Sequence, residues 1–150
     1  MQRHHEVEAL LRGGDGGLAR ECLDVFERRT RGQRGTLRLG YLRAAAVLAR
    51  WEGTEDEALS LLYEALGEAE RLWLPSEIWQ VSAALGEVHE ERGESGPSER
   101  AFGRAAAVVR QLATKIPEGA PRKGFLAAPQ VRRVLEKARG QGVHPGSPIL

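Results

Sequence analysis

Residues 85–105, LGEVHEERGESGPSERAFGRA, contain the pattern that decides the fold. A helical run ends in charged residues before Gly93, and a small residue, Ser98, follows five positions later. Apolar residues then stand at Phe102 and Ala105. Glycine accepts the left-handed backbone that ends many helices, and steps of four and three residues keep one face of the next helix apolar. The stretch therefore predicts two helices joined by a short turn.

The same pattern occurs in two earlier copies, with glycines spaced by 39 and 40 residues. A single helix pair cannot bury its apolar stripe alone, whereas pairs stacked side by side bury it together. The repeat predicts an all-α fold of antiparallel helix pairs, an α-solenoid of about three repeats. The equivalent positions are Gly14, Ala19, Leu23 and Phe26 in the first copy and Gly53, Ala58, Leu62 and Ala65 in the second.

Apolar periodicity and breaker residues set the expected helix boundaries. Pro117 and Pro121 are expected to break the chain, and a turn is expected over 93–97. Trp73 and Trp79 are expected to lock the turn around Pro75. The last helix is expected to cap a repeat domain over 1–139, followed by a flexible tail over 140–150. The expected helices are 4–12, 18–31, 36–51, 55–73, one from 75 to that turn, 98–116, a short one at 122–127, and 129–139.

These residues resemble a known family. The run Leu85-Gly86-x-x-His89, followed by Gly93, Phe102 and Ala105, is similar to a tetratricopeptide repeat, although an aromatic residue is usual at the position of His89. The segments PSEIWQ (75–80), KIP (115–117) and FLAAPQVRRVL (125–135) resemble the C-terminal repeat region of large bacterial ATPase-linked signalling and transcriptional regulators. The resemblance covers residues 55 to 139. Because the catalytic and DNA-binding domains of such regulators are absent, it implies a protein-binding or self-packing module.

The resemblance also implies where a partner would lie. In this repeat family, ligands commonly lie against the first helix of each pair, on the concave side. We therefore expect a non-catalytic scaffold that holds a protein or peptide segment in a groove with one basic and one acidic wall. The matching positions are Arg43, Val47, Arg50 and Trp51 in the third helix and Gln80, Ala83, Glu87, Glu90 and Glu91 in the fifth.

Charge is strongly segregated along the sequence, although the net charge is only +1. Residues 1–50 carry ten basic and six acidic side chains, residues 51–99 carry two and thirteen, and residues 100–150 carry ten and two. An alternative function is therefore self-association, with the acidic middle of one copy meeting the basic end of another, or a homodimer through an open solenoid end. A weaker alternative is phosphate contact with nucleic acid through Arg122, Lys123, Arg132, Arg133, Lys137 and Arg139.

Other chemistry finds little support in the sequence. His4 and His5 are adjacent and so point to different sides of a helix, and Cys22 is the only cysteine. The glycine-rich residues 13–17 lack the Lys-Ser/Thr that follows a phosphate-binding loop, and are expected to form a turn. We expect no catalytic centre, metal or cofactor. The N-terminus lacks the apolar core of a signal peptide, and no apolar run could span a bilayer, so we expect a cytoplasmic protein.

Overall fold

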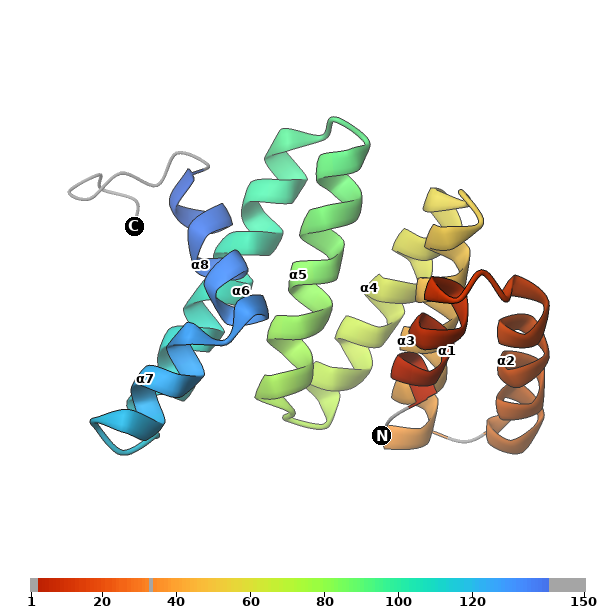
Figure 1. Cartoon of the computed structure of the whole chain (residues 1–150), viewed down its shortest axis with the longest axis horizontal. Helices are drawn as coiled ribbons and strands as arrows, with labels where there is room; N and C mark the ends of the chain where they lie inside the picture. Colours follow the sequence, from red (N-terminus) through yellow and green to blue (C-terminus); the bar gives the residue numbers. More distant parts are fainter. Residues whose placement is uncertain (1–2, 33, 141–150) are drawn as a thin grey trace. The chain divides into compact units, whose positions relative to one another are not determined.

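The computed structural model describes residues 3–32 and 34–140, which form eight helices and no strand (Figure 1). The prediction of an all-α fold is confirmed. The chain divides into two compact units, Met1–Leu74 and Pro75–Leu150. The tail expected over 140–150 falls, apart from Gly140, outside the described residues. A single domain over 1–139 stays a prediction.

The first unit contains four helices, α1 (Arg3–Arg12), α2 (Gly16–Thr30), α3 (Thr36–Trp51) and α4 (Glu55–Arg71). Helix α3 is central, because α1, α2 and α4 all pack against it, and α1 also packs against α2. The alanine-rich face of α3 allows these close approaches. A core cluster of this unit contains Val7, Leu11, Ala19, Leu23, Ala44, Ala45 and Leu48.

The second unit contains α5 (Pro75–Glu91), α6 (Ser95–Thr114), α7 (Ala120–Ala127) and α8 (Pro129–Gly140). Helices α5 and α6 lie side by side as an antiparallel pair, and α7 and α8 pack against α6 (Figure 1). The last helix covers a core with one apolar face, as Val131, Val134 and Ala138 are buried there. Their core neighbours are Trp79, Ala105, Ala106 and Val109.

The three repeat glycines end α1, α3 and α5 in the same way. Their φ angles are 79° at Gly14, 83° at Gly53 and 75° at Gly93. The N–H after each glycine donates to the carbonyl five residues back, as from Glu94 to His89 at 2.9 Å. This is the hydrogen bond of a left-handed helix cap, which satisfies a carbonyl that the helix itself leaves unbonded.

The other repeat positions are buried in every copy. The small residue and the two apolar residues of each second helix are all less than a tenth exposed. Each copy therefore has the turn and the buried positions that the sequence predicts. These nine residues are Ala19, Leu23 and Phe26 in α2, Ala58, Leu62 and Ala65 in α4, and Ser98, Phe102 and Ala105 in α6.

Three of the expected helix starts are wrong. Helix α6 begins at Ser95 and includes Pro97, and α7 begins at Ala120 and includes Pro121, which therefore does not break the chain. Proline is tolerated in the first turn of a helix because the N–H it lacks would have no partner within the helix. Helix α2 begins at Gly16, inside the expected glycine turn, where Asp15 accepts a hydrogen bond from the Leu18 N–H at 3.0 Å.

The two tryptophans around Pro75 do not lock a turn together. Trp79 is buried in the core of the second unit, whereas Trp73 is 87% exposed. Helix α4 ends at Arg71, two residues earlier than expected, and Trp73 has a φ of 55°. Trp73 therefore occupies the left-handed cap position that glycine fills after α1, α3 and α5.

Candidate functional site

The nine residues predicted to line a groove are divided between the two units. Val47 and Ala83 are half-buried and pack against the core clusters of the first and second unit respectively. Trp51 is 53% exposed. Its ring packs against Gly16 so closely that a Cβ added to this glycine would lie 2.7 Å from two ring atoms. Val47 and Ala83 therefore pack within their own units, whereas Trp51 does so only in part. Arg43, Arg50, Gln80 and Glu91 each make interactions within the protein.

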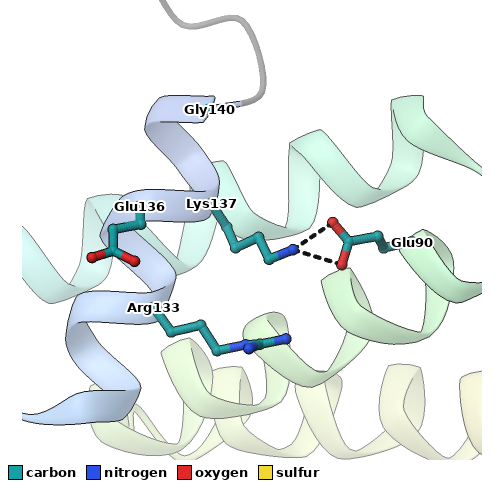
Figure 2. A pocket seen from close by; sticks show the side chains of 5 residues that line it. All are labelled: Glu90, Arg133, Glu136, Lys137 and Gly140. Atoms are coloured by element: carbon teal, nitrogen blue, oxygen red, sulfur yellow. Dashed lines mark hydrogen bonds and ion pairs between the residues drawn. The ribbon is translucent and has the colours of Figure 1, made fainter.

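The remaining two predicted residues, Glu87 and Glu90, face helix α8. The Arg133 Nε lies 3.1 Å from Glu87 Oε2, and the Lys137 Nζ lies 2.8 Å from both carboxylate oxygens of Glu90. Figure 2 shows Arg133 and Lys137 extending from α8 to the same side, with Glu136 pointing away from them. A hollow of about 330 Å³ lies here, lined by Glu90, Arg133, Glu136, Lys137 and Gly140. The basic C-terminal part of the sequence thus neutralises part of the acidic middle inside one unit.

Other basic residues of the C-terminal third also have partners nearby. Arg122 donates to the Ile116 carbonyl from Nε at 3.1 Å and from Nη2 at 2.8 Å, and so caps the end of α6. Arg132 pairs with Glu136, one turn further along α8, at 3.6 Å. Four of the six basic residues considered for phosphate contact therefore already have hydrogen-bond or ion-pair partners within the second unit.

A second hollow, of about 250 Å³, lies in the first unit between α4 and the beginning of α3. We call it the arginine pocket. Three of its residues are arginines, and two are glutamates, so its lining carries one net positive charge. The lining residues are Arg34, Arg38, Leu42, Glu64, Gly67, Glu68 and Arg71.

A buried carboxylate organises this pocket. The Glu68 side chain is only 8% exposed, and it accepts hydrogen bonds from Arg71 Nε at 3.1 Å and Nη2 at 2.7 Å. It also accepts the backbone N–H of Gly35 at 2.7 Å, and Arg34 Nη2 lies 3.5 Å away. Hydrogen bonds from Arg71 and then from Gly35 lower the pKa of Glu68 to about 2, and the carboxylate raises the pKa of Arg71. Glu68 therefore ties the α2–α3 loop to α4.

The other arginine of the wall is held by different partners. Arg38 pairs with Glu64 at 3.1 Å, and its guanidinium lies 5.2 Å from the centre of the Tyr41 ring. The Tyr41 hydroxyl donates to Glu27 at 3.0 Å. Burial, followed by this hydrogen bond to a carboxylate, raises the pKa of Tyr41 to about 12. Arg38 is thus presented at the pocket by an aromatic ring beneath it.

The sequence reasoning missed the arginine pocket entirely. A partial signal was present, because Glu64, Glu68 and Arg71 recur at helical spacing on one face of α4. The arginines opposite come from a separate helix and from the loop before it, and their approach to α4 depends on tertiary packing.

Comparison of the sequence with models of protein families, with curated proteins and with solved structures finds no match. Over residues 3–32 and 34–140, no group of three or more His, Cys, Asp or Glu side chains is arranged to hold a metal ion. No helix in this part of the protein has the length and apolar character needed to cross a membrane.

Proposed function

We propose that the protein is a non-catalytic scaffold of the tetratricopeptide-like kind, acting in the cytoplasm, which binds a segment of another protein. The observation that carries the proposal is the equivalence of the three helix pairs, α1–α2, α3–α4 and α5–α6. Each pair has a left-handed glycine cap and the same three buried positions in its second helix. Pairs built alike can stack into a solenoid, and a solenoid offers an extended concave surface to a partner.

The packing of the predicted groove residues narrows the contacts to be tested. Val47 and Ala83 pack against the cores of their units, and Glu87 and Glu90 pair with α8, whereas Trp51 touches Gly16 but stays 53% exposed and remains a proposed contact. The polar residues that remain as proposed contacts are Arg43, Arg50, Gln80 and Glu91. Each of them also interacts within the protein, so a partner would add to those interactions or replace them.

Affinity capture from nuclease-treated source lysate tests the proposal. The parent protein is compared with an Arg43→Glu/Arg50→Glu variant and with an Arg28→Glu/Arg29→Glu variant. The two variants change the charge equally, but Arg28 and Arg29 are exposed at the end of α2. A protein captured by the parent and by the α2 variant, but lost by the α3 variant, supports a groove. Equal capture by all three proteins excludes Arg43 and Arg50 as contacts.

Self-association is the competing proposal, and the ion pairs of α8 bear on it. Arg133 and Lys137 already pair with Glu87 and Glu90 in the same unit, so fewer charges are left for a second copy. Sedimentation at low and high salt separates the two forms of this alternative. Charge-driven association weakens at high salt, because screening acts over about 8 Å at physiological ionic strength, whereas an apolar dimer persists.

A further inference from the structure

The arginine pocket has the features of a binding site for an anionic group. Each guanidinium carries five N–H donors. Among the described residues, Glu68 takes two donors of Arg71 and lies near one of Arg34, and Glu64 takes one of Arg38. Most of the donors at this wall are therefore left to face the hollow or the solvent.

The carboxylate of Glu68 does not compete for those remaining donors. Its two oxygens already accept three hydrogen bonds and lie near a fourth donor, and its low pKa keeps it ionised. Glu68 therefore acts as an anchor that holds Arg71 through two hydrogen bonds, and the exposed Arg34 side chain lies beside it. An arginine fixed in this way binds a further anion with less loss of side-chain entropy.

A glycine at the wall offers a way to change the hollow without disturbing the packing around it. Gly67 lies inside α4, where glycine costs about 0.5–1 kcal/mol relative to alanine. Its backbone is helical, and an added Cβ would meet no atom within 4 Å. Neither backbone conformation nor packing therefore requires glycine here, and a side chain added at this position would extend from the wall of the hollow without a clash.

The size and charge of the pocket define the ligand. A volume of about 250 Å³ is below the usual range for a drug-sized molecule, about 300–1,000 Å³. The arginines of the lining, rather than its volume, favour an anionic group, and the fork of a guanidinium matches the two oxygens of a carboxylate. Leu42 adds an apolar surface beside the charges.

We propose that the arginine pocket binds a carboxylate group of an acidic segment of a partner protein. The carboxylate comes from an Asp or Glu side chain or from the partner's own C-terminus. This inference rests on the proposed scaffold function and names the chemistry that the partner presents.

An NMR titration of the arginine Nε–Hε signals tests the pocket with small probes, independently of any partner. N-acetylglutamate α-amide represents a side-chain carboxylate, N-acetylglycine represents a C-terminus, and N-acetylglutamine α-amide is the neutral control. Inorganic phosphate is titrated in the same way. We expect saturable shifts of the Arg38 and Arg71 signals with one or both carboxylate probes, at dissociation constants of about 1–10 mM, and none with the neutral probe.

The decisive variant is Gly67→Leu, which fills the hollow from its open wall. It replaces glycine by a better helix former, so the protein should fold at least as well. Gly103→Leu is the matched control, because Gly103 lies in α6, also has open space at its Cβ, and lines neither hollow. Gly67→Leu should weaken carboxylate binding by about tenfold or more, equivalent to 1.4 kcal/mol, and Gly103→Leu should not change it.

Any one of the following results would overturn the inference. Shifts absent with both carboxylates, or equal shifts with the neutral probe, would show that the pocket does not recognise the charge. Saturable binding of phosphate, without binding of either carboxylate, would show that the pocket recognises phosphate groups instead of carboxylates. Undiminished binding by a folded Gly67→Leu variant, checked by circular dichroism, would place the anion elsewhere. A partner captured from lysate equally by Gly67→Leu and parent would leave the scaffold function standing while rejecting this pocket.

Discussion

The second helix pair and the third close with different side chains at equivalent positions. In the second unit, Phe102 lies so near α5 that a Cβ on Gly86 would be 2.7 Å from the ring. In the first unit, the equivalent positions, counted from Gly53 instead of Gly93, are Ala46 and Leu62. Gly86, Phe102, Ala46 and Leu62 are all buried. A larger residue on one helix thus accompanies a smaller residue on the other. The comparison indicates that the second and third pairs keep a similar total volume at this contact, whereas the first pair has the larger combination of Val7 and Leu23 in the same register.

The two units also differ in what they leave at their surfaces. Among the described residues, the exposed large apolar side chains all belong to the first unit. The same unit holds the buried Glu68 carboxylate and the arginine pocket, whereas the second unit covers its core and its acidic helix with α8. The first unit is therefore the better place to look for a partner. The exposed residues are Leu18, Val25, Leu37, Trp51, Tyr63 and Trp73.

The largest effect is expected for Gly86→Ala, which breaks the close contact between α5 and α6. The added methyl overlaps three atoms of the Phe102 ring, and we expect a loss of about 2 kcal/mol in unfolding free energy after the gain in helix propensity. The double variant Gly86→Ala/Phe102→Leu copies the pair found in the first unit and should recover at least half of that loss. Urea denaturation of the parent, both single variants and the double variant measures the coupling. Additive effects would contradict the exchange of volume.

The next effect is expected for Glu68→Gln, which removes the charge that anchors the α2–α3 loop. Because the arginines around Glu68 are partly exposed, we expect a loss of about 1–2 kcal/mol near neutral pH. The folded pKa of about 2 lies below the ordinary value of 4.5. The stabilisation is thus present above pH 4.5 and is lost as the pH falls toward 2. Denaturation curves from pH 7 to pH 2.5 should show the variant and parent converging, and a constant difference would contradict this role.

A smaller effect of opposite sign is expected for Trp73→Gly. Trp73 adopts a left-handed backbone conformation that glycine adopts without strain, and its exposed side chain adds little to packing. The substitution should stabilise the protein by up to about 1 kcal/mol, because relief of strain is partly offset by the entropy that glycine adds to the unfolded state. Gly93→Trp is the reciprocal change and should destabilise. Stabilisation by both substitutions in thermal denaturation would show that the cap conformation is not the cause.

The smallest effect is expected for the ion pairs between α5 and α8. Arg133→Gln and Lys137→Gln should each cost about 0.5 kcal/mol, because exposed pairs contribute little. The loss should shrink further in about 0.5 M salt, where the charges are screened over a shorter distance. The second unit is therefore expected to depend on the buried face of α8 more than on its charges. A cost above about 2 kcal/mol for either change would contradict that view.

The helices and the glycine turns that end α1, α3 and α5 were predictable, because four positions recur in three copies with almost fixed spacing. The glycine position requires a positive φ, and the other three positions are buried, so each restricts the type of residue that can stand there. The starts of α6 and α7 were predicted too late, because Pro97 and Pro121 were assigned to turns and proline is common both in turns and in the first turn of a helix. Trp73 concealed a helix cap, because nothing in the sequence marks a left-handed tryptophan.

The candidate site was less predictable than the fold. The groove prediction placed Glu87 and Glu90 on an open wall, without anticipating that basic residues more than 40 positions later would pair with them. The arginine pocket lies beside an acidic helix, so the charge of the whole segment hides its local excess of positive charge. Such a balance depends on side chains brought together from α4, α3 and the loop before α3.

The most direct test of the account is quantitative affinity capture by the parent, Gly67→Leu and Gly103→Leu proteins from the same lysate, with bound proteins identified by mass spectrometry. The account predicts a protein with an acidic segment that binds the parent and the Gly103→Leu variant and is largely lost by Gly67→Leu. Capture of that protein by all three, or capture of no protein but further copies of the scaffold itself, would contradict it.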